Sequence, residues 1–494
     1  MILSAIQTTL LKQIYYFCQN KAKITISFYH IMLFGKRIKE LREYQKLPQR
    51  VVADALEITI PLYSRVERGE RTLSKSHLPK LAQVLNVEEN ELLKLYLADQ
   101  VALVLDGQPE IYNDVLDIAK RDIIQMTPNK PTVLDLFCGC GGLSRGFIDA
   151  GFSVKLGVDF DDKALESFAH NHEDAVAMKL DLFNLDNVEQ IKQFFTENGY
   201  ELDVLVGGPP CQGFSLAGPR QVDDSRNVLY QAMVKTATMM KPKVVVLENV
   251  PGMVQLHGGL VAEKIISDFT KLGYKMGYKI LYAPDYGIPQ IRKRVVFVGL
   301  LGAKEYFHYP EPTCQPENYV TCEEAIGDLP CLLNIEGDIV QQYETEPQSK
   351  YQEDRRKGSS AIHNHIGTIH DEKTKKFIAM VPEGKNYKSL PPEYAGIYKY
   401  HEALTRYHSK KPSPTINTGH RSHFHYKWDR IPTVRESARL QSFDDTFIFY
   451  GNKTQQYRQV GNAVPPLLGK AIAGEIKKWL DDKHSTRKKK NGSK

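Results

Sequence analysis

The sequence predicts an α/β protein whose larger part is a doubly wound parallel sheet, preceded by a small all-α domain. Short apolar runs alternate with helix-like stretches between residues 131 and 300, which is typical of strand–helix–strand units. A glycine-rich segment follows the first of these runs. From Gly35 to Leu97, by contrast, apolar residues recur at three- and four-residue steps, which indicates several short helices.

Length and composition exclude several protein classes. A chain of 494 residues favours about three domains. With 42% hydrophobic and 25% charged residues, it is neither collagen-like nor wholly disordered. Seven cysteines are too few for a disulfide framework and favour a reducing, cytoplasmic location. We expect no membrane segment, because no uninterrupted apolar run is long enough. A net charge of +6 permits a nucleic-acid partner without requiring one.

Composition shifts divide the chain into seven segments. Residues 1–34 are a leader of uncertain status, because Met32 directly precedes the first helix-like pattern and could be the true start. A domain of short helices (35–97) and a helical linker (98–130) follow, and Pro128 and Pro131 mark the end of the linker. We expect the α/β domain at 131–300, a loop-rich inserted domain at 301–430, a return to the α/β domain at 431–480 and a solvated, disordered basic tail at 481–494.

Three features at expected strand ends suggest a nucleotide-like cofactor. The glycines between Asp135 and Gly142 lie between a strand and a helix, where they let the backbone approach a ligand and leave helix N–H groups free. Asp159 ends the next strand and can accept both hydroxyls of a ribose. Asp181 follows a further β-like run and can bind an adenine amino group. The glycine cluster alone would also fit a tight structural turn.

Two residues at neighbouring strand ends carry the chemistry. Cys211 directly follows Pro209 and Pro210, which stop the strand and present the thiol at the edge where doubly wound sheets bind ligands. Glu248 ends the apolar run 244–247, where an unpaired carboxylate would be costly, so a partner is implied.

These segments resemble the DNA cytosine-5 methyltransferase family in motifs and order from Asp135 to Gly469. The match includes the glycine loop, Pro-Cys-Gln at Cys211, Glu248-Asn249-Val250 and Arg292-Lys-Arg294. It closes with Arg435 to Gln441 and the segment around Asn462. The resemblance implies an S-adenosylmethionine-dependent methyltransferase fold whose inserted domain recognises the target sequence. It makes Arg435 to Gln441 more typical of scaffold than of chemistry.

The resemblance also implies the roles of individual residues. Cys211 would add to carbon 6 of cytosine, Glu248 would bind ring nitrogen 3, and Arg294 would bind O2 with support from Arg292. The residues implied for S-adenosylmethionine binding are Phe137, Gly139, Gly142, Asp159, Asp181, Pro209, Leu229, Asn462 and Val464. The Pro209 carbonyl would also meet the cytosine amino group. Because Asn462 and Val464 lie late in the chain, the C-terminal segment should pack back onto the first strand region.

Double-stranded DNA is the implied substrate, with the target base flipped out of the helix. The resemblance places Ser215, Arg226 and Thr415 on the DNA backbone around that base. No metal site is expected, although His420, His423 and His425 cluster in sequence, because the mechanism needs none.

The segment from Leu47 to Gly69 resembles the Cro/repressor-like helix-turn-helix. Gln49, Ser64 and Arg65 are the DNA contacts that this resemblance implies. Glu57 stands where that family usually has a turn glycine. Ile60, Pro61 and Leu62 occupy positions that normally read base edges, and such apolar groups can contact a thymine methyl but offer no paired hydrogen bonds.

The sequence therefore predicts a DNA (cytosine-5-)-methyltransferase that modifies one specific duplex sequence, with a cognate restriction endonuclease as a functional partner. A monomer is expected, with dimerisation through the N-terminal domain left open. One alternative is a tRNA cytosine-5 methyltransferase, whose nuclear members carry a Cys-Phe-Thr signature absent here. Another is an amino-group methylase, which needs no cysteine after Pro-Pro. A third is a transcriptional regulator acting through the 35–97 module. The recognition sequence cannot be read from the chain.

Overall fold

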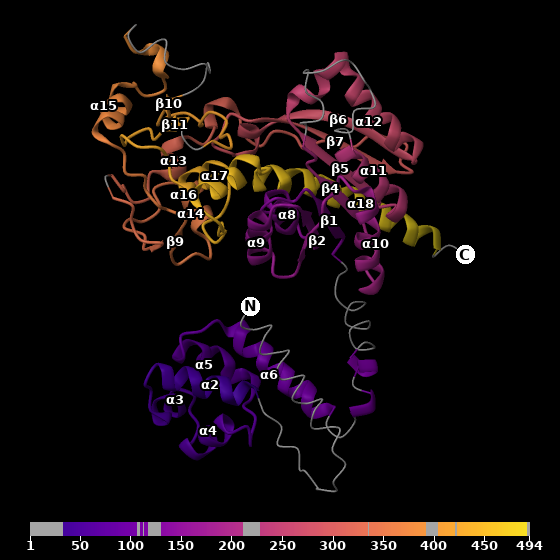
Figure 1. Cartoon of the computed structure of the whole chain (residues 1–494). Coiled ribbons are helices and arrows are strands. Elements are labelled where there is room, and N and C mark those ends of the chain that lie inside the picture. Colours follow the sequence, from indigo (N-terminus) through magenta and orange to yellow (C-terminus); the bar gives the residue numbers. More distant parts are fainter. Residues whose placement is uncertain are drawn as a thin grey trace. The chain divides into compact units, whose positions relative to one another are not determined.

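The computed structural model describes residues 33–105, 109–111, 113–116, 130–210, 228–333, 335–391, 404–419 and 422–491. The chain divides into two compact units between Asn129 and Lys130 (Figure 1), at the proline-rich stretch that the sequence marks as a boundary. Residues 1–32, which form most of the predicted leader, lie outside the described part.

The N-terminal unit is helical throughout its described residues. Its helices are α2 (Leu33–Tyr44), α3 (Gln49–Ala55), α4 (Ile60–Glu67), α5 (Leu78–Val84) and α6 (Glu89–Val104), with 3₁₀ turns at Lys75–His77 and Pro109–Ile111. Apolar residues at helical spacing form one shared core, in which Ile38, Val52, Tyr63 and Leu81 are fully buried. The helical periodicity of this region is therefore confirmed.

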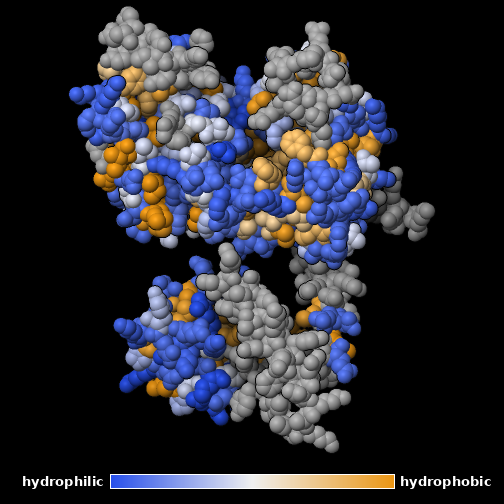
Figure 2. Space-filling model, in the orientation of Figure 1, coloured by the Kyte–Doolittle hydropathy of each residue, from blue (hydrophilic) through white to orange (hydrophobic). Residues whose placement is uncertain are grey.

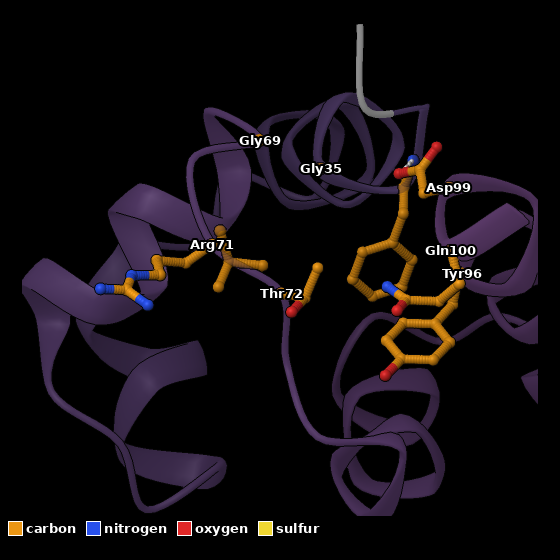
Figure 3. A pocket seen from close by; sticks show the side chains of 9 residues that line it. Gly35, Gly69, Arg71, Thr72, Tyr96, Asp99 and Gln100 are labelled. Atoms are coloured by element: carbon orange, nitrogen blue, oxygen red, sulfur yellow. Dashed lines mark hydrogen bonds between the residues drawn. The ribbon is translucent and has the colours of Figure 1, made fainter. Parts of the chain in front are cut away.

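Helix α6 continues beyond residue 97, where the sequence predicts the end of the domain. Its Asp99 accepts hydrogen bonds from the backbone N–H groups of Leu33 and Phe34, at 3.0 and 3.1 Å. Figure 3 shows Asp99 and Tyr96 of α6 at a pocket that Gly35 of α2 also lines. Because the first N–H groups of a helix have no partner within it, Asp99 caps α2. Asp99, which the sequence places in the linker, thus belongs to the packed part of this unit.

The turn between α3 and α4 keeps a left-handed backbone without glycine. Glu57 has φ +58°, a conformation that costs an ordinary L-residue strain. Its carboxylate pairs with Lys80 Nζ at 2.7 Å. The turn geometry expected of a helix-turn-helix is therefore present although the usual glycine is not.

A seven-stranded sheet forms the centre of the C-terminal unit, in the order β3-β2-β1-β4-β5-β7-β6. The strands are β1 (Thr132–Leu136), β2 (Ser153–Asp159), β3 (Val176–Lys179), β4 (Val204–Gly207), β5 (Val244–Asn249), β6 (Tyr274–Tyr282) and β7 (Lys293–Leu301). The first five run parallel. Strand β7 is antiparallel to both β5 and β6, so the predicted parallel sheet is parallel over its first five strands and antiparallel at this edge. A short connection joins β6 to β7, and only antiparallel neighbours can be linked without a crossover.

Helices cover both faces of this sheet. One face carries α10 (Val188–Glu197), α11 (Val228–Met240) and α12 (Leu260–Lys271). The other carries α8 (Gly142–Asp149), α9 (Asp162–Asn171) and α18 (Pro466–Asn491). Helix α18, yellow in Figure 1, packs against α8 from the far end of the sequence. The doubly wound fold class is thus confirmed, and the last covering helix comes from the C-terminal return.

The inserted region has little regular structure, as predicted. Its helices and strands are α13 (Cys322–Ile326), β8 (Val340–Gln341), α14 (Lys350–Arg356), β9 (Ile362–His363), α15 (Glu372–Met380), β10 (Thr405–Arg406) and β11 (His423–Phe424). Helices α16 (Val434–Leu440) and α17 (Lys453–Asn462) follow. The chain also forms 3₁₀ turns at Leu185–Asn187, Pro251–Gly259, Ala283–Tyr286, Pro316–Asn318 and Tyr387–Ser389.

The predicted boundary at residues 430 and 431 runs through one packed core. Cys322 and Ile362 of the inserted region share this core with Leu440 and Val460. Helix α16 is buried along its whole length, so the scaffold role predicted for Arg435 to Gln441 is confirmed.

The C-terminal end differs from the expected disordered tail, because α18 remains helical to Asn491. None of the helices in the described ranges is both long and apolar enough to cross a bilayer. On the face shown in Figure 2, apolar residues appear in small groups among polar ones.

Candidate active site

A cleft of about 860 Å³ opens at the carboxyl ends of the parallel strands. Its lining comes from the segments after β1, β2, β3, β4 and β5, from the start of β7 and from the link between α17 and α18. Parallel strands end at the same edge of a sheet, and ligands of open α/β folds bind there. All nine residues predicted for the cofactor line this cleft, together with Glu248 and Arg294.

The glycine loop after β1 is shaped by three left-handed residues. Phe137, Gly139 and Gly141 have φ of +61°, +53° and +93°. A Cβ added to Gly139 would meet no atom within 4 Å, whereas one added to Gly142 would lie 2.4 Å from the Val464 carbonyl oxygen. The space beside the Gly139 backbone is therefore open to the cleft. Gly142, by contrast, packs directly against the C-terminal return. That return, predicted from Asn462 and Val464, is confirmed.

Asp159 is held at the wall of the cleft by backbone donors. Its Oδ2 accepts a hydrogen bond from Gly139 N at 2.8 Å, and its Oδ1 accepts from Phe160 N and Asp161 N at 2.7 and 3.0 Å. These bonds join the ends of β1 and β2 and fix the direction of the carboxylate. Asp181 lies on the same cleft, where its Oδ1 accepts from Phe183 N at 2.9 Å.

Two exposed aromatic residues of the cleft received no role from the sequence. Phe160 and Phe183 are 71% and 57% exposed although both are apolar. Rings held in contact with water at a cleft provide flat surfaces for stacking. Each follows an acidic residue at a strand end by one or two positions, and that spacing is the signal that could have identified them.

Asp135 lies at the bottom of the cleft and is nearly inaccessible to solvent. Burial raises the pKa of its carboxyl to about 7. The Ser144 hydroxyl donates to Asp135 Oδ2 at 2.6 Å, which ties β1 to α8.

The end of β4 lies against the end of β5. Asn249 Nδ2 donates to the Pro209 carbonyl oxygen at 2.8 Å, so this carbonyl, expected to meet a cytosine amino group, already has a partner in this structure. A Cβ on Gly208 would lie 3.1 Å from Glu248 Oε2. The missing side chain therefore lets Glu248 approach the segment that leads to Cys211.

The partner implied for Glu248 is Arg294. Arg294 Nε lies 2.6 Å from Glu248 Oε1, and the two side chains are 12% and 10% exposed. Both lie on the cleft. An arginine and a carboxylate placed together there can bind the complementary donors and acceptors of a planar polar ring.

Arg292 lies behind the cleft and not on it. Its guanidinium donates to the backbone carbonyls of Ile416, Gly461 and Ala463 at 3.1, 2.9 and 3.2 Å. Burial lowers its pKa to about 9. Gly461 and Ala463 alternate with Asn462 and Val464, so Arg292 braces the segment that closes the cofactor side. The structure thus gives Arg292 a positioning role.

Of the remaining predicted contacts, the structure describes Thr415. Thr415 donates its hydroxyl to the Ile291 carbonyl oxygen at 2.5 Å and is exposed. Cys211, Ser215 and Arg226 fall outside the described residues.

In the N-terminal unit, all three predicted DNA contacts interact within the domain. Gln49 Nε2 donates to Glu67 Oε2 at 2.6 Å. Ser64 accepts from Arg68 at 2.9 Å, and Arg65 Nε lies 3.6 Å from Glu70 Oε2.

Within the described ranges, no three His, Cys, Asp or Glu side chains are grouped to hold a metal ion. His420 lies outside those ranges. Burial lowers the pKa of His423 to about 4 and that of His425 to about 3. His425 Nδ1 accepts from the backbone N–H groups of Lys427 and Trp428 at 3.0 and 3.2 Å, which is a structural role.

Comparison with known proteins identifies the family. Residues 131–478 match the model of the C-5 cytosine-specific DNA methylases. The chain belongs to this family. Residues 38–92 match a helix-turn-helix model. The methylase is a DNA (cytosine-5-)-methyltransferase, and enzymes of this kind use S-adenosylmethionine as methyl donor.

Its relatives include type II methyltransferases. It is 35% identical to the type II methyltransferase M.DdeI of Desulfomicrobium norvegicum, over 71% of this chain and 89% of the relative. Identity to the type II methyltransferase M1.HphI of Haemophilus parahaemolyticus is 36%, over 70% and 87%. A crystal structure of a putative DNA modification methyltransferase from an E. coli prophage matches with a TM-score of 0.60 and 28% identity, over 71% of this chain and all of the other.

Proposed function

We propose that this methylase transfers a methyl group from S-adenosylmethionine to carbon 5 of cytosine in one specific duplex sequence, as the modification enzyme of a restriction-modification system. The observation that carries the proposal is the Glu248–Arg294 pair, which shares a cleft with all nine predicted cofactor residues and lies beside the segment leading to Cys211. A cognate restriction endonuclease would be the functional partner, and the methylase would act as a monomer.

The cleft fits the methyl donor. The open space beside the Gly139 backbone leaves room for a ligand. The oriented Asp159 carboxylate can accept hydrogen bonds from ribose hydroxyls. The exposed ring of Phe160 can stack on an adenine. Asp181, Leu229 and the Asn462–Val464 segment would complete the binding site. When bound, S-adenosylmethionine supplies an electrophilic methyl group.

The protein's own residues would activate the base. The Cys211 thiolate adds to carbon 6 of cytosine, and the electron pair of the 5,6 double bond becomes available at carbon 5. Glu248 holds a proton at ring nitrogen 3 and lowers the cost of that addition. Arg294 turns from Glu248 to O2 of the base. After carbon 5 has taken the methyl group, a base removes its proton, and the thiolate of Cys211 leaves.

The other cysteines of the cleft do not suit this role. Burial raises the pKa of Cys138 well above its ordinary value and that of Cys140 to about 12. Both thiols therefore stay protonated at neutral pH, and a thiol is a much poorer nucleophile than a thiolate.

Substitution of Cys211 tests the proposal. Cys211→Ser should abolish methyl incorporation into cytosine, because a serine hydroxyl is far harder to ionise. Bisulfite sequencing of a genome that expresses the wild type would report both activity and target sequence. Cys140→Ser is the matched control and should retain activity. Undiminished methylation by the Cys211→Ser protein would refute the proposal.

A second candidate function is sequence-selective DNA binding by the N-terminal unit, with repression of the enzyme's own operon. The helix-turn-helix match and the unit's separate core favour it. The Cys211→Ala protein should then still protect its promoter in a footprint. Absence of a footprint by the intact protein would exclude this function.

A further inference from the structure

The first turn of helix α4 carries apolar side chains that are exposed to solvent. Tyr63 and Val66 face the core and are fully buried, whereas Ile60 and Leu62 are 41% and 37% exposed. Leaving two branched aliphatic side chains in water forgoes stabilisation that burial would provide. In a helix-turn-helix, the N-terminal residues of this second helix face base edges in the major groove.

Several polar side chains on and around α4 already have partners within the unit. Glu67 is buried and holds both Arg42 and Gln49. Ser64 is bonded to Arg68. Ile60 and Leu62 therefore supply the apolar part of the readout by α4, beside the exposed guanidinium of Arg65. The chemical feature that apolar side chains recognise in the major groove is the 5-methyl group of a pyrimidine.

Two bases of DNA carry that group at the same position. Thymine has it always, and cytosine acquires it when this family of enzymes acts. An apolar pair that contacts one can contact the other, because the methyl group projects into the major groove from carbon 5 in both.

We propose that Ile60 and Leu62 form a reader of pyrimidine 5-methyl groups, through which the N-terminal unit prefers thymine to uracil and 5-methylcytosine to cytosine. The enzyme would thus carry a module able to sense its own reaction product. The inference rests on the DNA-binding role proposed for this unit and not on methyl transfer in the cleft.

The test begins by isolating the module's site. Full-length wild type and the Ile60→Ala/Leu62→Ala double variant select sequences from random duplex DNA, and a site enriched by the wild type alone belongs to the module. Because both side chains are exposed, the variant should fold and methylate as the wild type does. Val104→Ala, which trims an 81% exposed side chain elsewhere on the same unit, is the matched control and should select the same site as the wild type.

The selected duplex is then synthesised with uracil in place of thymine, and with cytosine or 5-methylcytosine at each pyrimidine. Each contacted methyl group that is removed should weaken wild-type binding about fourfold, and the double variant should not respond. If only the uracil probe binds more weakly, the module recognises the methyl group of thymine. If the 5-methylcytosine probe binds more tightly than the cytosine probe, the module recognises the methylated product. Equal wild-type affinity for all probes would overturn the reader alone. Failure to find any module-dependent site would overturn both the reader and the second candidate function, while methylation activity would remain an independent result.

Discussion

The Glu248–Arg294 pair and the Arg430–Glu436 pair contain the same two chemical groups at the same distance, 2.6 Å. Their surroundings differ. Glu248 and Arg294 face a cleft. Arg430 and Glu436 are 1% exposed, and Glu436 also accepts from the Thr433 backbone N–H at 2.7 Å. One pair can exchange its partner for a ligand, and the other cannot.

The buried pair is part of a larger group of charges around α16. Arg439 lies between Asp328 and Asp445, with contacts of 2.8 and 2.7 Å. We call Asp328, Arg430, Glu436, Arg439 and Asp445 the α16 charge network. It joins the inserted region to the C-terminal return, so here the ion pairs hold two parts of the chain together.

The largest expected effect is that of Arg439→Met. It removes the cation that Asp328 and Asp445 share, and breaking a buried pair costs about 3–5 kcal/mol. Because Asp328 keeps Arg356 at 2.5 Å and Asp445 keeps Arg435 at 3.8 Å, we expect the lower end of that range. Urea unfolding of the variant measures it. Arg294→Met is the matched control, which should lose activity and little stability. Equal stability of both variants would remove the distinction between the two regions.

Glu248→Gln should lower activity strongly and change stability little, whereas Arg439→Met should mainly lower stability. The amide keeps the shape of the side chain but cannot donate a proton as the acid does, so kcat should fall about 10²- to 10⁴-fold. Its unfolding free energy should stay within about 1 kcal/mol of the wild type, because the cleft admits water. Methyl incorporation at saturating substrate, together with a urea titration, tests both halves. A variant that is active but unstable would place Glu248 with the scaffold.

The smallest effect concerns pH. Burial lowers the pKa of His365 and His423 to about 4 and that of His425 to about 3. Below pH 6.5 these histidines bind protons in the unfolded chain but not in the folded one, so stability falls as the pH falls. Between pH 7 and about 5.5 each should cost about 1 kcal/mol.

Urea unfolding at the two pH values measures this loss. His423→Leu should remove the share of one histidine, because burial is the cause of its shift. The wild type minus variant difference isolates His423, because Asp135, whose pKa is raised to about 7, shifts stability in the opposite direction in both proteins. An identical pH dependence in the two proteins would show that the site of His423 is more open to water than its packing indicates.

Local patterns predicted the parts of the fold that depend on neighbouring residues. The strands β1, β2, β4 and β5 lie where short apolar runs occur, and the helical spacing of the N-terminal unit corresponds to its core. The direction of β7 was not predictable, because an apolar strand buried on both faces reads the same in either direction. The extent of α6 was also missed, since the partner of Asp99 lies more than sixty residues earlier.

The residues of the candidate site also divide into those that the sequence predicted and those that only the structure revealed. Strand-end position and side-chain chemistry singled out Glu248 and Asp159, and the family resemblance added Val464. It could not show that Arg292 holds backbone carbonyls behind the cleft, nor that Phe160 and Phe183 line it, since these roles depend on which distant segments meet.

The amino-acid sequence by itself determined the family and the alternation of strands and helices, because these follow from residue type and short-range spacing. Only the tertiary structure decided which charges are buried scaffold and which face the cleft. The strength and the role of an ion pair depend on how much water surrounds it, and that is set by chain segments that no local pattern brings together.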